Sequence, residues 1–424
     1  MKALIITYYW PPAGGSGVQR WLKFVKYLQE FGITPVVYTV KNPEYAIEDA
    51  TLQSEIPEGV VVIRQPIWEP YTWANFFLKK RSAQTKAGFL SKKPSLLGKL
   101  VTYIRANCFI PDARVFWVKP SISYLQKYLK ENPVDVVITT GPPHSMHLIG
   151  LGLKEKMNLK WMADFRDPWT AIDYFHHLPF TEKSKQKHHA LEREVLERSD
   201  AVLVVGKTMQ QDYLKYNAKA HVISNGFDTE ISRNDQVLDR TFSITHIGMM
   251  NEDRNPMILW KVLSELRNEI AGFFNDLEIK LVGKVAPAVL DTIVSEGLGT
   301  KLQHIDYLPH KKVLHFQQKS QVLLLSVNKV PSAKGIVTGK IFEYIIAKRP
   351  ILAIGPEGGD LAEIIKQTNS GTIISFEDYQ KLKEEITEMY ANYLKGDLSV
   401  KSRDVNRYHR KEITKQLAQL IKDI

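Results

Sequence analysis

Short runs of apolar and β-branched residues alternate with amphipathic helical stretches along most of this chain, and this alternation limits its fold more than any other feature. A helix between two strands favours a parallel sheet, because the helix returns the chain to the same edge of the sheet. Residues 2–224 contain one such series, and residues 243–354 contain a second. The sequence therefore predicts an α/β fold with two Rossmann-like, doubly wound domains.

The expected elements follow from these patterns. In the first series we expect helices at residues 19–31 and 182–198, and strands at residues 2–7, 34–39, 60–63, 134–139, 160–164, 201–205 and 221–224. In the second series we expect a helix at residues 341–348, and strands at residues 243–248, 277–282, 321–326 and 350–354. A last helical pattern covers residues 405–424.

A polar, irregular stretch at residues 225–240 separates the two series and suits a linker. A chain of 424 residues is long enough for two or three domains. We therefore expect an N-terminal domain at residues 1–225 and a C-terminal domain at residues 240–400. Ligands of doubly wound domains bind at the carboxyl ends of the strands, so we expect the sites to face a cleft between the domains.

The chain is basic, with a net charge of +11 and a pI near 9.3, and its charge is unevenly distributed. Residues 79–119 contain ten Lys or Arg residues and one acidic residue, Asp112, with aromatic residues between them. Three interpretations stay open: a solvated surface, a surface that binds anionic membranes, and a nucleic-acid site. No recognition-helix, RNP-type or zinc-finger pattern supports nucleic acid.

One cysteine, Cys108, leaves no partner for an internal disulfide, which suits a reducing compartment. The apolar run at residues 3–6 is too short for a signal peptide, and no run approaches the roughly 18 apolar residues of a membrane span. We expect a cytoplasmic protein, and the basic segment also suits peripheral attachment to the inner face of the membrane.

A glycine-rich loop follows the first expected strand. Gly14 and Gly15 lie where this strand meets a helix, although the loop lacks the G-x-G-x-x-G spacing of a dinucleotide site. Glycines here allow the backbone to approach an anion closely, with N–H groups directed at it. The alternative is a tight turn that needs a positive φ.

The segment KGIVTGKIFEY, at residues 334–344, resembles a phosphate-binding P-loop but is one residue short and lacks the hydroxyl that binds magnesium. Thr338, Gly339 and Lys340 begin an expected helix, so backbone N–H groups and an ammonium would meet a phosphate there. Glu343 lies on the same face and can accept two hydrogen bonds from a ribose diol. The segment predicts a nucleoside diphosphate site with solvent-facing side chains. The alternative is an ordinary exposed helix.

Further polar residues follow other expected strands. Arg254 precedes a helix start, where its guanidinium could bind a diphosphate through two hydrogen bonds. His144 and Asp164 follow two strands of the first series and are candidates for contact with a substrate. The histidine pairs at residues 176–177 and 188–189 lack the H-E-x-x-H spacing, so we expect no metal site.

At this point the chain resembles the family 4, or group 1, retaining glycosyltransferases of GT-B fold. The stretches that carry the resemblance run almost end to end: YYWPPAGGSGVQR, TTGPPHSMHLIG, ADFRDPWT, VISNGFD, HIGMMNEDRNP and KGIVTGKIFEYIIAKRPILAIGPEGG. The resemblance implies a nucleotide-sugar donor held mainly by the second domain, as a substrate and with no cofactor. It also implies that the helix at residues 405–424 crosses back to the first domain.

The resemblance assigns roles to individual residues. Arg254 and Lys340 would meet the diphosphate, Glu343 the ribose, and Leu308 to His310 would lie near the base. His144 and Asp164 would orient the sugar or the acceptor. The sequence departs from the family pattern where the first glutamate of E-x7-E is expected, because Gly335 stands there. A second departure is Met249, which replaces an arginine often found after the glycine of its loop.

The expected activity is transfer of a sugar, of hexosyltransferase type, to a lipid-linked or cell-surface polysaccharide precursor. The absence of a D-x-D motif at a strand end agrees with metal-independent transfer, and the resemblance implies retention through attack on the same face. Two alternatives stay open. One is a nucleotide-sugar epimerase of the same fold, and the other is a non-catalytic basic protein that binds membrane surfaces.

Overall fold

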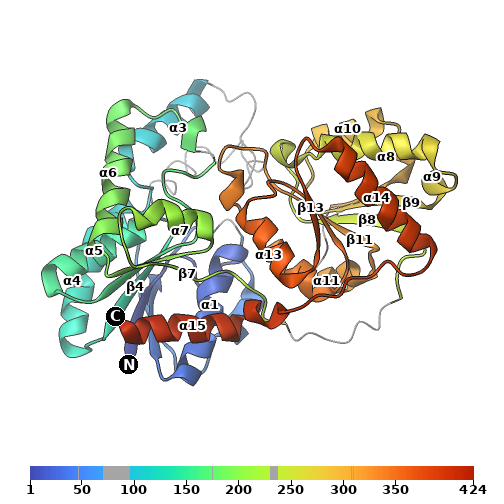
Figure 1. The fold of residues 1–424 in the computed structure, drawn as a ribbon. Helices are drawn as coiled ribbons and strands as arrows, with labels where there is room; N and C mark the ends of the chain where they lie inside the picture. The colour runs from blue at the N-terminus through green and yellow to red at the C-terminus, as the bar shows by residue number, and fades with distance from the viewer. Residues whose placement is uncertain (46, 70–95, 174, 230–236, 307, 309) are drawn as a thin grey trace. The chain divides into compact units, whose positions relative to one another are not determined.

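The computed structural model describes residues 1–45, 47–69, 96–173, 175–229, 237–306, 308 and 310–424. Residues 79–95 of the basic segment, with six of its ten basic residues, therefore lie outside the described residues. The chain divides into two units: unit 1 contains Met1–Asp228 and Arg410–Ile424, and unit 2 contains Thr229–His409. Each unit has its own parallel sheet covered by helices, which confirms the predicted α/β fold class (Figure 1).

Among the described residues, unit 1 has a seven-stranded sheet in the order β3-β2-β1-β4-β5-β6-β7, with every pair parallel. Its strands are β1 (Lys2–Ile6), β2 (Thr34–Val40), β3 (Val61–Gln65), β4 (Val136–Gly141), β5 (Trp161–Phe165), β6 (Ala201–Val204) and β7 (Ala220–Val222). Its helices are α1 (Ser16–Leu28), α3 (Leu96–Cys108), α4 (Val115–Glu131), α5 (Ser145–Met157), α6 (Glu182–Arg198), α7 (Lys207–Leu214) and α15 (Arg410–Asp423).

The strand order of unit 1 reverses at β1, which pairs with β2 on one side and with β4 on the other. Chains leaving β1 and β4 therefore run to opposite faces of the sheet from adjacent strand ends. This switch point is where ligands of doubly wound sheets bind. It positions the loops after β1, β4 and β5 at one edge.

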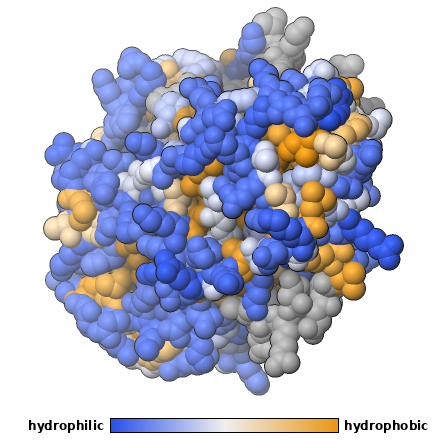
Figure 2. Space-filling model, turned by 45° about the vertical axis from the view of Figure 1, so that its right-hand side comes forward, coloured by the Kyte–Doolittle hydropathy of each residue, from blue (hydrophilic) through white to orange (hydrophobic). Residues whose placement is uncertain are grey.

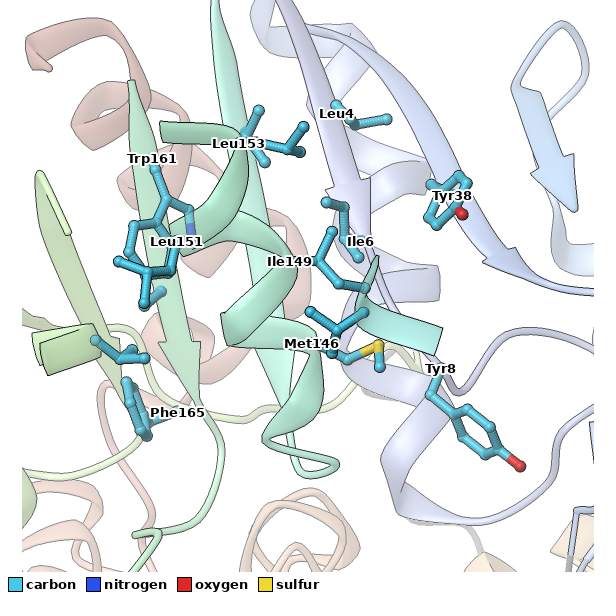
Figure 3. Close-up of a cluster of buried hydrophobic side chains, with 14 of the residues drawn as sticks. Leu4, Ile6, Tyr8, Tyr38, Met146, Ile149, Leu151, Leu153, Trp161 and Phe165 are labelled. Carbon is cyan, nitrogen blue, oxygen red and sulfur yellow. The ribbon is translucent and has the colours of Figure 1, made fainter. Parts of the chain in front are cut away.

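Alternate residues of β1 serve the two faces of the sheet, as the twofold period of a strand requires. Leu4 and Ile6 belong to a buried cluster with Met146 and Ile149 of α5, and the close-up in Figure 3 shows Ile6 beside Ile149. The β1 residues between them face the other way, into a second buried cluster with α1. Both faces of the sheet are thus closed by apolar helices.

The last helix of the chain belongs to unit 1, where α15 lies beside α1 (Figure 1). Ile413, Leu417 and Ile421 are spaced by one helical turn and are buried in the same cluster as Trp21 of α1. The helix begins later than the sequence predicts. Residues 405–408 form a short 3-10 turn, and the extended backbone of His409 separates it from α15.

Among the described residues, unit 2 has a six-stranded parallel sheet in the order β10-β9-β8-β11-β12-β13. Its strands are β8 (Phe242–Ile247), β9 (Leu277–Val282), β10 (Leu302–Ile305), β11 (Val322–Ser326), β12 (Ile351–Ile354) and β13 (Gly371–Ile374). Its helices are α8 (Met257–Glu269), α9 (Phe273–Asp276), α10 (Pro287–Ser295), α11 (His310–Lys319), α12 (Lys340–Ala347), α13 (Asp360–Thr368) and α14 (Tyr379–Leu394).

Every strand that the sequence predicts is present, with bounds within two residues of those expected. The sequence pattern missed β10 and β13, the two edge strands of unit 2. Both are four residues long and only partly buried, so they lack the continuous apolar run of a central strand. On the molecular face drawn in Figure 2, hydrophilic residues predominate and hydrophobic ones form small separate groups.

Candidate functional site

Helix α12 carries the predicted phosphate-binding residues of unit 2, and its apolar face fixes its position. Ile341, Tyr344 and Ile345 are buried against the sheet. The hydroxyl of Tyr344 accepts a hydrogen bond from the N–H of Ile247 at 3.0 Å and donates one to the carbonyl of Leu324 at 3.4 Å. The N-terminus of α12 is thereby held beside the ends of β8 and β11.

Lys340, the first residue of α12, extends its side chain past the loop after β8. Its Nζ lies 3.3 Å from Nε2 of His246 and 3.3 Å from the carbonyl oxygen of Met249. Gly248 lies directly beneath this side chain: a Cβ there would be 2.3 Å from Cε of Lys340, and its φ is +115°. Glycine is required at this position on both counts. Lys340 as a whole is partly exposed, while its amine lies against these two protein groups.

Arg254 ends the short 3-10 turn η4 (Glu252–Arg254) and reaches the same carbonyl. Its Nε donates to Oδ1 of Asn328 at 2.6 Å, and one terminal nitrogen donates to the Met249 carbonyl at 3.2 Å. Two cationic side chains therefore meet at one carbonyl oxygen. An anion placed beside them would be attracted by both.

The electrostatics of Lys340 reflect this crowding. Burial, together with the smaller effect of the charge of Arg254, lowers the pKa of its amine to about 7, although Glu343 acts in the opposite direction. Burial also keeps the pKa of His246 well below its ordinary value, with the charge of Lys340 adding to the effect. His246 is therefore neutral, and the amine of Lys340 changes its charge near neutral pH.

Glu343 lies one turn after Lys340 and is partly buried. Its carboxylate accepts a hydrogen bond from Nε2 of Gln317 on α11 at 3.2 Å. Thr338 accepts from the backbone N–H of Lys340 at 3.3 Å, and a Cβ on Gly339 would meet no atom within 4 Å. Of the segment proposed to lie near the base, Leu308 is partly buried, whereas residue 309 and the side chain of His310 lie outside the described residues.

Sequence reasoning missed His246, Asn328 and Gln317, which hold Lys340, Arg254 and Glu343 respectively. These three supporting residues lie on β8, after β11 and on α11. Their side chains are buried. Polar residues at or near the ends of apolar strands, such as His246 and Asn328, were the one signal in the sequence that could have indicated these supporting residues. No local sequence motif identifies them.

In unit 1, the structure supports the turn interpretation of the glycine loop. Gly15 has a φ of +83° and precedes α1. The N–H of Gly14 donates to the carbonyl of Ile47 at 2.9 Å, and a Cβ on Gly14 would lie 2.8 Å from a methyl of that residue. Close packing and backbone conformation thus explain both glycines, without requiring an anion.

Asp164, at the end of β5, is fully buried and receives four hydrogen bonds. Arg20 donates two, at 2.8 and 3.2 Å, Trp21 donates one at 2.7 Å, and Thr140 donates one at 2.8 Å. Burial alone would raise the pKa of Asp164, but the charge of Arg20 and these hydrogen bonds outweigh it and lower this pKa. The carboxylate joins α1 to β4 and β5, so its geometry favours a structural role over substrate contact.

His144 precedes α5 and stacks on Trp169, with ring centroids 4.8 Å apart and an interplanar angle of 6°. Burial, aided by the charges of His147 and Arg166, keeps its pKa well below the ordinary value, so the ring is neutral. Its Nδ1 is buried, with no hydrogen-bond partner among the described residues. Of the two predicted unit 1 side chains, His144 is thus the one with an unsatisfied polar atom.

Arg166 follows β5 and organises the loops around His144. Its guanidinium donates to the carbonyl of Gly17, in the first turn of α1, and to those of Gly141 and Pro142, at the end of β4 and just after it. These contacts connect the ends of β4 and β5 to the start of α1 at the switch point of the sheet. The sequence pattern placed this arginine beside Asp164 but did not reveal this function.

The described part of the chain contains neither a candidate metal site nor a candidate membrane-spanning helix. There, no group of three or more His, Cys, Asp or Glu side chains has a geometry that could hold a metal ion. Likewise, no helix in that part is both long enough and apolar enough to cross a bilayer.

Residues 15–231 match the model of Glycosyltransferase Family 4, which therefore covers more than half of the chain. Among solved structures, sucrose-phosphate synthase from Thermosynechococcus elongatus is similar, with a TM-score of 0.61 and 13% identity over 100% of this chain and 98% of that chain. A mutant of S. aureus TarM in complex with Fondaparinux, alpha-GlcNAc-glycerol and UDP has a TM-score of 0.59 and 11% identity over 99% of each chain.

A third similar structure is described as trehalose-6-phosphate from E. coli bound with UDP-2-fluoro glucose, with a TM-score of 0.59 and 9% identity over 100% of this chain and 99% of that chain. At these identities the structures show a shared fold. No curated protein sequence matches the chain.

The geometry of Asp164 predicts that Asp164→Ala destabilises the protein by about 3–5 kcal/mol, because Arg20 would remain as a buried charge without its carboxylate. Denaturant unfolding measures this loss, with the exposed Asp212→Ala as the control, expected within about 0.5 kcal/mol of the unchanged protein. Since folding lowers the pKa of Asp164, its stabilisation is present above about pH 4 and is lost as the pH falls through the lowered pKa. Full stability with lost activity would instead indicate substrate contact.

Proposed function

This chain belongs to glycosyltransferase family 4 and has the GT-B fold, and from that premise we propose that its donor is a nucleotide sugar bound by unit 2. The observation that carries the proposal is the meeting of Lys340 and Arg254 at the Met249 carbonyl, with Glu343 one helical turn further on. Two cations suit a diphosphate, and a carboxylate suits the two hydroxyls of a ribose. The UDP and UDP-2-fluoro glucose in structures of the same fold support this choice of ligand.

In the proposed reaction, the bond between the sugar C1 and the phosphate oxygen breaks, and a bond forms between C1 and an acceptor hydroxyl oxygen. Negative charge develops on the diphosphate, where Lys340, Arg254 and the N-terminus of α12 stabilise it. The acceptor proton moves to the departing phosphate oxygen on the same face, so the configuration at C1 is retained. This route requires no carboxylate nucleophile and no metal ion.

His144 is the unit 1 residue that we propose to contact the sugar or the acceptor. Its ring is neutral and held by Trp169, so it acts as a hydrogen-bonding group rather than as a charge. Asp164 and Arg166 hold the surrounding strand ends in place. The proposal therefore separates one contact residue from two positioning residues.

For the acceptor we propose a lipid-linked or cell-surface polysaccharide precursor reached at an anionic membrane surface. Helix α3 supports this choice because Leu100 and Ile104, one turn apart, are 53% and 41% exposed, and Val101 and Tyr103 are exposed beside them. The helix also carries the exposed Lys99, and the chain as a whole is basic. Apolar and basic residues on one helix suit the interface of an anionic bilayer. Such binding would keep the protein at the cytoplasmic face of a membrane.

Two other functions compete with transfer. A nucleotide-sugar epimerase would use the same donor residues but no acceptor, and membership of a transferase family argues against it. A non-catalytic basic protein would have no use for a carboxylate one turn after the cationic pair. Incubation with nucleotide sugars, with and without candidate acceptors, separates these functions by their products: a glycoside, an epimer or neither.

The donor site predicts that Glu343→Ala weakens donor binding or transfer by about 2–5 kcal/mol, because two charge-assisted hydrogen bonds to the ribose are lost. Lys340→Ala and Arg254→Ala each lower the transfer rate by roughly 100-fold or more. Calorimetric titration with a panel of UDP-, GDP-, ADP- and TDP-sugars measures the first effect, and product formation measures the second. The control is Lys348→Ala at the other end of α12. Full activity of Glu343→Ala contradicts the assignment.

A metal-free mechanism predicts that EDTA leaves the transfer rate unchanged, since Lys340 and Arg254 supply the positive charge that a divalent ion would otherwise provide. The rate is measured before and after dialysis against the chelator and again after addition of magnesium. Loss of activity that magnesium restores would show that the reaction uses a metal ion.

The proposed membrane surface predicts that the double variant Leu100→Asp with Ile104→Asp binds anionic vesicles at least tenfold more weakly than the unchanged protein, because two apolar contacts become charged. Vesicle sedimentation measures the binding, which also weakens as salt increases. Leu394→Asp, an equally exposed apolar residue of unit 2, serves as the control. Equal binding by the α3 variant and the control would assign α3 to the solvated surface.

A further inference from the structure

His246 is a fully buried histidine whose two ring nitrogens both have partners. Its Nδ1 lies 3.1 Å from the carbonyl oxygen of Leu324, in the neighbouring strand β11. Its Nε2 faces Nζ of Lys340 at 3.3 Å. The imidazole thus lies between a backbone carbonyl in the sheet and the lysine at the start of α12.

The first contact assigns the tautomer of the ring. A carbonyl oxygen only accepts hydrogen bonds, so Nδ1 carries the proton and Nε2 carries the lone pair. Lys340 is then the donor toward Nε2. The direction of each hydrogen bond is determined by the position of one carbonyl in the sheet.

Lys340 is surrounded by a small set of groups from separate elements. His246 faces it from β8, the Met249 carbonyl from the loop after β8, Arg254 from η4, and Glu343 from α12 itself. Arg254 repels the ammonium, Glu343 attracts it, and the two uncharged acceptors direct its N–H bonds. Gly248 leaves the space through which the side chain passes.

We propose that His246 is a positioning residue that holds the amine of Lys340 beside Arg254, and that binding of a diphosphate brings a proton to this amine. The inference rests on the proposed function, because it requires that the anion at this site is the diphosphate of the donor. Beyond the proposed function, the inference assigns a role to His246, which does not touch the substrate, and predicts that a proton is taken up when the diphosphate binds.

The sign of the effect follows from the surroundings of the amine. Burial lowers the pKa of Lys340 to about 7, so a large fraction of the amine is uncharged at pH 8. A bound diphosphate raises this pKa by placing negative charge beside the ammonium. Affinity is therefore fully present below about pH 7 and falls as the pH rises above it, by up to tenfold per pH unit until the pKa of the complex is reached.

The first experiment measures proton uptake at pH 8, where the phosphates of a free nucleoside diphosphate are already ionised. The full-length protein is titrated calorimetrically with UDP, GDP, ADP, TDP and inorganic pyrophosphate in two buffers that differ in ionisation enthalpy. The expected uptake is between one half and one proton per bound ligand. Lys340→Arg, whose guanidinium stays charged, is expected to bind without this uptake, which also corrects for protons exchanged by the ligand.

The second experiment follows affinity against pH in two variants of His246. His246→Leu removes the acceptor, so the charged amine is less stable and the fall in affinity begins roughly one pH unit lower. Affinity then drops about tenfold at pH 8 and less than about twofold at pH 6. The Leu324 carbonyl retains the Tyr344 hydroxyl, so the leucine leaves no buried carbonyl without a donor. His246→Gln keeps an acceptor near Nε2 and is expected to restore the original profile.

The outcomes separate the two proposals. If a nucleoside diphosphate binds without proton uptake, or if His246→Leu lowers affinity equally at every pH, this inference fails and the donor site stands. If pyrophosphate binds with uptake but no nucleoside diphosphate binds more tightly, the anion site stands and the nucleotide-sugar proposal fails. If none of these ligands binds, both fail. If His246→Leu does not fold, His246→Gln and Lys340→Arg still decide the outcome by their pH profiles.

Discussion

The hydrogen bonds at the Met249 carbonyl are the interaction on which the account of unit 2 depends. Lys340 and Arg254 approach the same oxygen, at 3.3 and 3.2 Å, although like charges repel. The protein keeps them together by anchoring each elsewhere, Lys340 through His246 and Arg254 through Asn328. Folding therefore bears the energetic cost of holding the two cations close together. An anion that binds there is attracted by both cations, and no further rearrangement of the site is needed.

In unit 1, the candidate site is held together by a different set of interactions, namely buried polar contacts at the ends of neighbouring strands. Asp164 accepts from α1 and β4, and Arg166 donates to the first turn of α1 and to the last residue of β4. These contacts connect elements far apart in the sequence at the one edge where a doubly wound sheet presents its loops. These contacts, and the stacking of its ring on Trp169, hold His144 in position. This network is stable because its buried polar groups are hydrogen-bonded to one another. Both oxygens of the Asp164 carboxylate are therefore already occupied by protein donors.

The fold was largely predictable from the sequence, and the site only in part. Central parallel strands are buried on both faces, so runs such as Val322–Ser326 are almost entirely apolar and easily recognised, whereas the edge strands β10 and β13 are not. Lys340, Arg254 and Glu343 could be proposed as site residues because a helix start and its first turn have a local signature. His246, Asn328 and Gln317 were missed because they are recruited from other elements by tertiary packing. The role expected of Asp164 changed for the same reason: its partners Arg20 and Trp21 lie more than a hundred residues away in the sequence.

The most direct test of the central claim is a crystal structure of the protein with a bound nucleoside diphosphate. We expect diphosphate oxygens within about 3 Å of Nζ of Lys340 and of the Arg254 guanidinium, with both ribose hydroxyls donating to the carboxylate of Glu343. His246 would keep its contact with the Leu324 carbonyl in the complex. A diphosphate bound away from these two cations, or a Glu343 carboxylate that contacts no part of the ligand, would contradict the account.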